Sequence, residues 1–423
     1  MTGEAEPMAS GALAPAPTAA FAEPVARVRG WWTAAVVLAN VGVFAAFLGP
    51  IQVLLAKQAD VVAGSNKEFV FGLVTGVGAA VSVVANPLAG AFSDRTGSRF
   101  GRRVPWVLGG ALGGAAGLLI LAGAGAVAVM LVGWCLVQAS CNALLAAITA
   151  AVPDRVPKVQ RGVVGGWVAL AQTVGALVGV ALATIVGGIG VGYVACAVFL
   201  LLSVIPYVVR SGDQRLPAKE RLVWREFAKS FWLSPRKYPD FGWAWLTRFL
   251  LNLGNGLGTL YLLYYLQDAV HYSDPDTGVL ILTAVYSLCV VLAAVWFGSW
   301  SDRIGRRKIF VTWSGIVMAA GGMVLAIWPT WAAAIIGAII IGIGFGVYLS
   351  VDFALLTEVL PNARDRAKDL GVINIANSLP QVVAPAIAAP IVKVLGGYPV
   401  LYTLASVVTL AGAVLVRKVK AVA

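Results

Sequence analysis

The chain has 423 residues, of which 60% are hydrophobic and 12% are charged. A soluble domain carries about twice that charged fraction, so the composition excludes an ordinary soluble protein. The net charge of +12 would suggest nucleic-acid binding in a soluble protein, but here the Lys and Arg residues gather between apolar runs. We therefore expect the lipid bilayer as a partner and no nucleic acid.

Apolar runs of about 20 residues recur along nearly the whole chain, each long enough to cross about 30 Å of hydrocarbon. We predict an all-α membrane protein with twelve transmembrane helices. The six of the first half cover about 31–56, 68–92, 104–123, 126–150, 163–187 and 190–209. The six of the second half cover about 241–266, 277–300, 309–328, 332–357, 371–395 and 399–416.

The segments outside these spans are predicted as follows. Residues 1–30 are rich in Ala and Pro and lack the pattern of a signal peptide, so we expect a disordered cytoplasmic tail. Residues 211–240 form a basic cytoplasmic connection whose apolar positions favour an amphipathic helix on the inner surface, with a flexible linker as the alternative. The two helical bundles then cover 31–210 and 241–418, and residues 419–423 form a short tail.

The Lys and Arg residues predict the orientation. Of the 31, we place 27 in the tails and in alternate loops. Lys57, Lys67 and Lys393 face the other side, and Arg248 lies inside a span. Because basic residues mark the cytoplasmic side, we predict a multi-pass plasma-membrane protein with both termini in the cytoplasm.

A charged motif is repeated between apolar runs. Residues 90–106 read GAFSDRTGSRFGRRVPW, and residues 298–311 read GSWSDRIGRRKIFV. Other matches between the halves keep an offset of about 209 residues, such as Leu48-Gly49 with Leu257-Gly258. The chain is therefore an internal duplication of a six-helix unit with the same orientation in both copies.

This repeated Asp-Arg with Gly-Arg-Arg resembles the signature of major facilitator transporters, and the resemblance covers essentially the whole chain. It implies two pseudo-symmetric six-helix bundles, a site between them near the midplane, alternating access and a monomer. The extended first copy looks most like the sucrose-type and glycoside–pentoside–hexuronide sugar–cation symporters. Pro153-Asp154 and Asp365-Arg366 also look like that branch.

The resemblance implies that the motif is a conformational latch. Asp94 would face the N-terminus of helix 11 in the other half, and Asp302 would face the start of helix 5. Such contacts contribute about 1 kcal/mol each, because unpaired N–H groups and the helix dipole favour a negative charge. The alternative is that the motif only sets orientation. The predicted latch residues are Gly90, Asp94, Arg95, Arg102, Arg103, Asp302, Arg303, Arg306 and Arg307.

Polar residues inside the spans fall at helical spacing, so each helix presents one polar stripe. The fold implied by the resemblance would point the stripes of spans 1, 4, 7 and 10 into a central cavity. Amides donate and accept hydrogen bonds, which suits a hydroxyl-rich solute; for any single amide, an interhelical hydrogen bond is the alternative. Tyr261, Tyr264 and Tyr265 would add aromatic surface. The predicted substrate-binding residues are Asn40, Gln138, Asn142, Gln172, Asn252, Asn255, Tyr348, Asn377 and Gln381.

Arg248 and Asp352 are the charges that we place well inside spans, at roughly 10 Å and 13 Å from the same face. Either charge alone would be costly there, so a pair is expected. In one interpretation Asp352 carries the coupling proton and releases Arg248. In the other the two form a fixed ion pair or an inner gate. Spans 1 to 6 offer only one acid, Glu68, at their outer edge.

The leading hypothesis is a secondary active transporter for a small polar solute, a sugar or glycoside, working as a proton-coupled symporter. The alternative is a proton-driven efflux antiporter for amphipathic compounds, which Trp296, Trp300 and Trp313 would suit. A receptor or channel is a third class, which the duplicated latch disfavours. We expect no enzyme, metal or cofactor other than a proton or other coupling cation, because no Ser/His, metal or nucleotide constellation is present.

Overall fold

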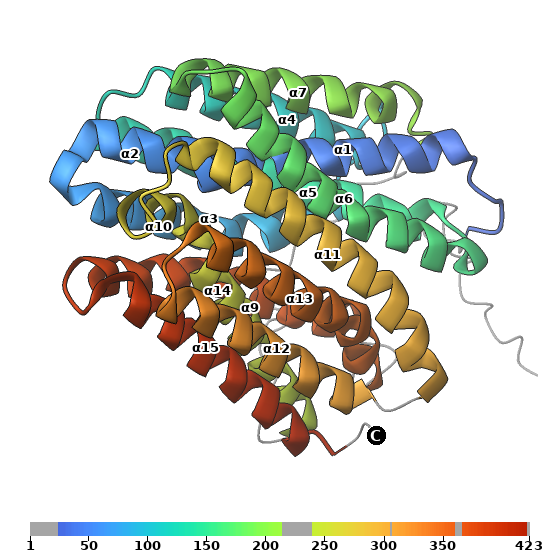
Figure 1. Cartoon of the computed structure of the whole chain (residues 1–423). Coiled ribbons are helices and arrows are strands. Elements are labelled where there is room, and N and C mark those ends of the chain that lie inside the picture. Colours follow the sequence, from blue (N-terminus) through green and yellow to red (C-terminus); the bar gives the residue numbers. More distant parts are fainter. Residues whose placement is uncertain (1–23, 214–238, 305–306, 360–365, 421–423) are drawn as a thin grey trace, which may run out of the picture.

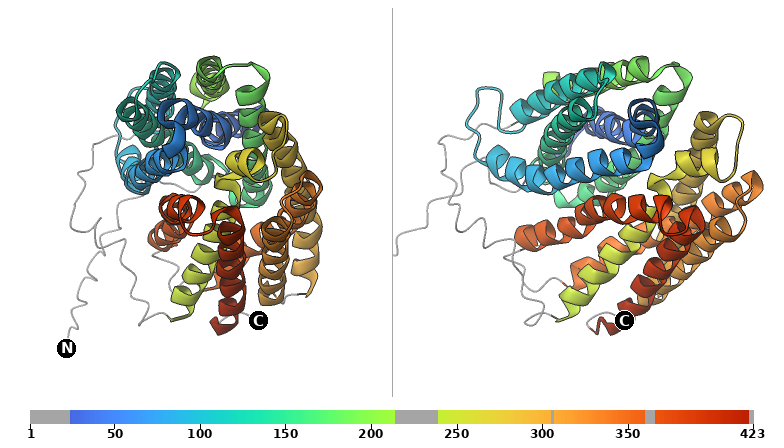
Figure 2. Two further views of the ribbon diagram at one scale, coloured as in Figure 1. Left: turned by 60° about the vertical axis from the view of Figure 1, so that its left-hand side comes forward. Right: turned by 90° about the vertical axis from the view of Figure 1, so that its left-hand side faces the viewer.

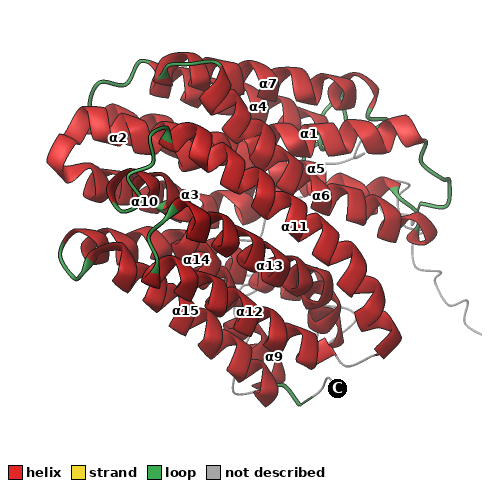
Figure 3. Ribbon diagram, viewed as in Figure 1, coloured by secondary structure: helices red, strands yellow, loops and turns green. Residues whose placement is uncertain are grey.

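The computed structural model describes residues 24–213, 239–304, 307–359 and 366–420. Within these ranges the regular elements are helices (Figure 3). The first half comprises α1 (Gly30–Gly49), η1 (Pro50–Leu54), α2 (Leu55–Ala63), η2 (Gly64–Asn66), α3 (Lys67–Asp94), α4 (Val104–Ala122), α5 (Val127–Arg155), α6 (Lys158–Ile185) and α7 (Ile189–Arg210). The second half comprises α9 (Pro239–Leu260), α10 (Leu262–Asp268), α11 (Pro275–Ile304), α12 (Arg307–Ile327), α13 (Trp331–Val359), α14 (Arg366–Lys393), α15 (Gly397–Leu415) and η3 (Val416–Lys418).

Every predicted span corresponds to one helical crossing. The first span is α1, η1 and α2 in succession, and the seventh is α9 with α10. Among the described residues, ten helical stretches are long and apolar enough to cross a membrane, and one of them, Gly30–Asp94, includes the first two spans. Helix α9 is not among the ten, which agrees with the polar stripe that it carries. The all-α, multi-pass fold is therefore confirmed.

The two halves form two bundles side by side, which pack together along α3 with α14 and along α6 with α11 (Figures 1 and 2). We call the end with loop 95–103, the start of α1 and the end of α15 the basic face. The other end, with turns 64–66, 269–274 and 394–396, is the opposite face. In Figure 1 the second bundle slopes away from the first toward the basic face, on the right.

The first helix of each bundle is interrupted at equivalent positions. Residues 50–54 form a π-helical segment that begins at Pro50, and α9 ends one residue before Tyr261. The repeat offset of about 209 places Tyr261 opposite Gln52. Proline cannot donate the helical hydrogen bond, and π segments are frequent at functional sites, which makes these two interruptions pointers to a binding site.

Small residues allow close packing inside the first bundle. A Cβ atom added to Gly179 would lie 2.5 Å from the carbonyl oxygen of Ala45, and one added to Gly49 would lie 2.5 Å from that of Gly179. Helices α1 and α6 therefore touch through their backbones, which small residues at the contact allow.

The predicted tails and connection fall mostly outside the described residues. Of 211–240, the structure describes 211–213 and the start of α9, so the expected amphipathic helix stays a prediction.

Candidate functional site

A cavity of about 260 Å³ lies between the two bundles. Helices α1, η1 and α6 line it from the first bundle, and α9 to α14 line it from the second. Five predicted binding residues line it: Gln172, Asn252, Asn255, Asn377 and Gln381. The sequence prediction did not include six further polar residues of the lining, which are Gln52, Thr173, Thr259, Thr283, Tyr286 and Ser287.

The polar stripes of α9 and α14 meet at one wall of this cavity. Arg248 donates from Nε to Oδ1 of Asn377 at 2.6 Å. Asn252 donates to the same oxygen at 3.3 Å, to the hydroxyl of Tyr348 at 3.3 Å and to the carbonyl of Arg248 at 2.9 Å. The guanidinium thus holds Asn377, and Asn377 with Tyr348 orients Asn252.

A hydrogen bond crosses between the bundles within the cavity. Thr283 of α11 donates to Oε1 of Gln52 at 3.1 Å. Gln52 lies in the π-helical segment, and its side chain reaches the other bundle through this bond. On the second bundle, Tyr286 donates to Oδ1 of Asn255 at 3.3 Å. These contacts leave amide N–H groups and hydroxyl oxygens available to a bound solute.

Three predicted binding residues lie inside the first bundle and do not line this cavity. Asn40 is buried and donates to the carbonyl of Val36 at 2.9 Å. Asn142 donates to the backbone and side-chain oxygens of Gln138, at 2.8 and 3.1 Å, and accepts from Asn86 of α3. Among the described residues, the polar stripe of span 4 faces α3 and does not line this cavity as predicted. Spans 5, 8 and 11 contribute polar residues to the cavity in its place.

The three tyrosines predicted as cavity aromatics lie at the opposite face. Tyr264 donates to the carbonyl of Ala56 at 2.7 Å, and Tyr261 donates to that of Glu68 at 3.2 Å. Both rings meet Phe71 edge-on, while Tyr265 donates to the carbonyl of Leu325 within its own bundle. Tyr261 and Tyr264 therefore join the two bundles, and none of the three tyrosines lines the cavity described above.

Two ion pairs also join the two bundles at the opposite face. Lys57 pairs with Asp276 at 2.5 Å, and Lys67 pairs with Asp268 at 3.1 Å. Asp268 also accepts from the hydroxyl of Tyr398 at 2.7 Å. We call these two ion pairs, with the contacts of Tyr261 and Tyr264, the opposite-face seal. It joins the two bundles at the end away from the basic face.

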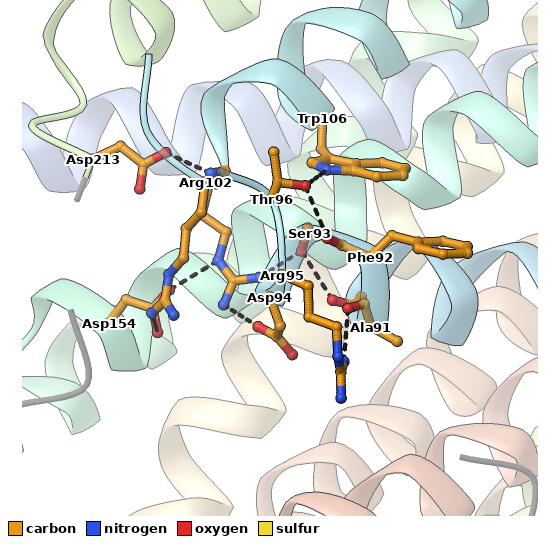
Figure 4. A network of polar contacts seen from close by, with 12 residues as sticks. Ala91, Phe92, Ser93, Asp94, Arg95, Thr96, Arg102, Trp106, Asp154 and Asp213 are labelled. Carbon is orange, nitrogen blue, oxygen red and sulfur yellow. Dashed lines mark hydrogen bonds and ion pairs between the residues drawn. The ribbon is translucent and has the colours of Figure 1, made fainter. Parts of the chain in front are cut away.

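The first copy of the repeated motif forms a charge network centred on Arg103, which is buried. Figure 4 shows the neighbouring residues of this network, among them Ser93, Asp94 and Asp154. Arg103 donates to Asp94 at 2.5 Å, to Asp154 at 2.9 Å and to the hydroxyl of Ser93 at 2.5 Å. Arg102 is also buried and pairs with Asp154 at 2.6 Å. Burial lowers the pKa of Arg103, but attraction to Asp94 and Asp154 outweighs it and raises the pKa overall, so this group stays charged.

Asp213, just after α7, accepts from the backbone N–H groups of Arg103 at 2.5 Å and Val104 at 2.9 Å. These groups begin α4, so the carboxylate lies at a helix N-terminus, where it is favoured. Burial nevertheless raises the pKa of Asp213 above its ordinary value of 3.8, although the two N–H groups lower it.

Because the folded protein then binds this proton more tightly than the unfolded chain does, the contribution of Asp213 to stability is largest below pH 3.8 and falls as pH rises through the raised value. Asp213→Asn keeps an oxygen acceptor and removes the buried charge. We expect its unfolding midpoint at pH 7 to equal or exceed that of the wild type, with the advantage shrinking toward pH 4. Thermal unfolding at pH 4, 5.5 and 7 measures this; a lower midpoint at pH 7 would contradict it.

The other predicted latch residues are placed as follows. Arg95 donates to the carbonyl of Ala91 at 2.9 Å and so caps its own helix. A Cβ atom added to Gly90 would meet none of the described atoms within 4 Å, so no described helix makes a close contact at Gly90 in this conformation. Arg303 is exposed near the end of α11, and Arg307 begins α12.

Several predicted contacts lie outside the described residues. Arg306 is not among the described residues. For Asp302, Asp352 and the first turns of α14, the structure describes the helix but not the side chains. The contact of Asp94 with helix 11, its repeat at Asp302 and the pairing of Arg248 with Asp352 therefore stay predictions.

Two six-helix bundles related by duplication, with a polar cavity between them, define a multi-pass membrane transporter. The family model of the Major Facilitator Superfamily matches residues 32–282 and 255–422, and the chain belongs to this family. It is accordingly a transporter and not an enzyme. The sucrose-type or glycoside–pentoside–hexuronide subtype is not established by this match.

Curated relatives match a shorter segment. Myo-inositol transporters 3A and 3C of Cryptococcus neoformans var. grubii are 29% and 27% identical over 130 residues, which is 31% of this chain. The match spans 22% of the length of each relative.

Solved structures share the fold over nearly the whole chain. A peptide transporter in complex with sulfate has a TM-score of 0.75 at 12% identity and covers 94% of this chain and 96% of its own. A bacterial homologue of the human lysosomal transporter Spinster, in an inward-facing and unoccupied conformation, has a TM-score of 0.68 at 14% identity, covering 93% and 96%. At these identities the likeness concerns the fold alone.

Proposed function

We propose that this protein is a secondary active transporter that carries a neutral, hydroxyl-rich solute of the sugar or polyol class by alternating access. The observation that carries the proposal is the cavity between the bundles, whose described polar lining consists of amides and hydroxyls from both halves. Such groups match a polyol, which needs many donors and acceptors and no compensating charge. The curated myo-inositol transporters are consistent with a polyol.

The size of the cavity agrees with a small solute. Its volume of about 260 Å³ lies just below the usual range for ligand pockets, about 300–1,000 Å³, which suits a small solute. Apolar residues such as Leu48, Ile51 and Phe345 complete the lining. They can cover the carbon faces of a sugar ring while the amides bind its hydroxyls.

We place the basic face in the cytoplasm, because positively charged residues stay on that side of the membrane. The opposite-face seal then closes the outer side, and this conformation faces inward. To face outward, the seal must open and the basic ends must approach each other. Asp94 would then leave its ion pair with Arg103 and contact the N-terminus of α14.

Coupling to a proton or another cation is assigned to Asp352, because it is the acid that the sequence places deep in a span near Arg248. We expect Asp352→Asn to abolish accumulation driven by a pH gradient, since the variant cannot titrate, while solute binding changes by less than about tenfold. Uptake by proteoliposomes with and without a gradient measures this. Uptake by the variant that still follows pH would show that the coupling site is elsewhere.

The efflux alternative loses the support that aromatic residues gave it. Trp296, Trp300 and Trp313 are exposed on the outer surface of α11 and α12 and do not line the cavity described above. Exposed tryptophans near a membrane boundary are typical of the interfacial belt. The described site therefore favours a polyol over an amphipathic compound.

A ligand screen on the purified full chain tests the proposal. Thermal unfolding would be measured with millimolar myo-inositol, hexoses, pentoses, disaccharides and amphipathic amines at pH 5.5 and 7.5. A solute at one hundred times its Kd stabilises the folded state by about 2.7 kcal/mol, which raises the unfolding midpoint measurably. We expect a polyol to do so. Stabilisation by the amines alone would refute the proposal in favour of the efflux alternative.

A further inference from the structure

A second, smaller cavity of about 20 Å³ lies behind the wall of the main one, among α9, α12, α13 and α15. Four residues line both cavities: Asn255, Gly258, Thr259 and Ile341. The two spaces therefore adjoin at these four residues. A volume of this size holds about one hydroxyl group or one water molecule.

Tyr402 of α15 lines this side cavity, and its side chain is fully buried. Among the described residues its hydroxyl has no hydrogen-bond partner. A buried hydroxyl without a partner costs about 1–3 kcal/mol, so the position calls for an oxygen that accepts from it. A molecule held in the side cavity that Tyr402 lines can supply that oxygen.

The neighbouring hydroxyls do not accept a hydrogen bond from Tyr402 in the structure, but they can bind the same molecule in the side cavity. Ser406 donates to the carbonyl of Tyr402 at 2.8 Å, and Thr409 donates to that of Ala405 at 2.7 Å. Thr259 likewise donates to the carbonyl of Asn255 at 2.9 Å. Each of these hydroxyl protons is used within its own helix, so each oxygen keeps lone pairs for a donor.

Gly258 lies where the two cavities adjoin. A Cβ atom added there would meet none of the described atoms within 4 Å, so the described residues leave room at this glycine. By contrast, a Cβ atom added to Gly254, one turn earlier, would overlap the hydroxyl of Thr409. Among the described residues, α15 therefore packs directly against Gly254, whereas space remains beside Gly258.

From this geometry we infer that the side cavity is a subsite for one exocyclic hydroxymethyl group of the solute in the main cavity, with Tyr402 donating to its oxygen. A ring hydroxyl stands one bond from the ring, whereas a hydroxymethyl oxygen stands one carbon further and can reach from the main cavity into the adjoining side cavity. The inference rests on the proposed function and narrows its substrate class to hexoses over pentoses. A site that hydrogen-bonds a substrate hydroxyl discriminates strongly against the analogue that lacks it.

The test compares sugar pairs that differ by this group alone, D-glucose with D-xylose and D-galactose with L-arabinose. Binding of each to the purified full chain would be measured for the wild type, Gly258→Ala, Tyr402→Phe and Gly256→Ala. The last is the matched control: Gly256 lies on the same helix and lines the main cavity but not the side cavity, and a Cβ atom there makes an ordinary contact of 3.7 Å with Ala384.

We expect the wild type to prefer the hexose of at least one pair by tenfold or more. Gly258→Ala and Tyr402→Phe should weaken hexose binding about tenfold and leave pentose binding unchanged, while Gly256→Ala keeps the preference. Equal effects on hexose and pentose would overturn the subsite and indicate a resident water in the side cavity. Binding of pentoses or myo-inositol without any hexose preference would overturn the subsite and keep the proposed function. If none of the sugars binds, the proposed function fails and the subsite with it.

Discussion

Arg103→Ala is expected to lower the stability of the folded protein by about 3 kcal/mol and to abolish transport. The guanidinium is buried and holds both Asp94 and Asp154, so its removal takes the Arg103 cation from Asp94 and leaves Asp154 with Arg102. Removing one partner of a buried ion pair costs about 3–5 kcal/mol, and the partial exposure of the two acids places the effect at the lower end. Thermal unfolding in detergent should show a midpoint lower by on the order of 5 °C.

Two variants of the same motif control this prediction. Arg99→Ala removes an exposed guanidinium from the same loop and should change stability by less than about 0.5 kcal/mol. Asp94→Asn keeps an oxygen that accepts from Arg103, so we expect near-normal stability, normal membrane insertion and no transport. Transport by Asp94→Asn would show that the motif sets orientation and does not act as a latch. Normal stability of Arg103→Ala would show that Arg102 alone suffices for Asp154.

Asn377→Leu is expected to weaken solute binding by about 100-fold. Its Oδ1 accepts from Arg248 at 2.6 Å and from Asn252 at 3.3 Å, so the change releases two groups that shape one wall of the cavity. A hydrogen bond to a charged group contributes about 1.5–3 kcal/mol, and each 1.4 kcal/mol corresponds to tenfold in affinity. Binding of the solute identified by the ligand screen measures the effect.

Gln138→Leu is the matched control for this variant, because it also removes a membrane-embedded amide. Gln138 is buried inside the first bundle and hydrogen-bonds Asn142. We expect Gln138→Leu to change stability by about 1 kcal/mol while binding stays within about threefold. Comparable losses of binding in the two variants would mean that the solute is bound inside the first bundle and not between the bundles.

Most of the fold could be predicted from the sequence. Each helix that crosses a bilayer needs about 20 apolar residues, because its backbone must satisfy its own hydrogen bonds in lipid. This requirement marks the crossings directly, including α1 with α2 as one span. The duplication is also visible in the sequence. The Asp-Arg and Gly-Arg-Arg motif occurs at residues 90–106 and again at 298–311, and its charges stand out between apolar runs.

The site could be predicted only in part. The stripes of Asn252 and Asn377 reach the cavity as expected, because few other surroundings accept so many amides in a membrane. Gln138 and Asn142 form an equally regular stripe but face α3. Thr283, Tyr286 and Ser287 were missed although their spacing, at i, i+3 and i+4, places them on one face. Ser and Thr hydroxyls often bond to their own helix, so they give a weak signal.

The sequence by itself determined the twelve crossings, the duplication and the positions of the basic loops, since all three follow from local hydrophobicity and charge. Only the tertiary structure decided the partners: Arg103 between Asp94 and Asp154, Thr283 with Gln52 across the bundles, and Tyr264 in the opposite-face seal. The reason is geometric. Helical periodicity shows which residues share a face, but the neighbour of that face depends on how each helix is rotated and how the two bundles are tilted against each other.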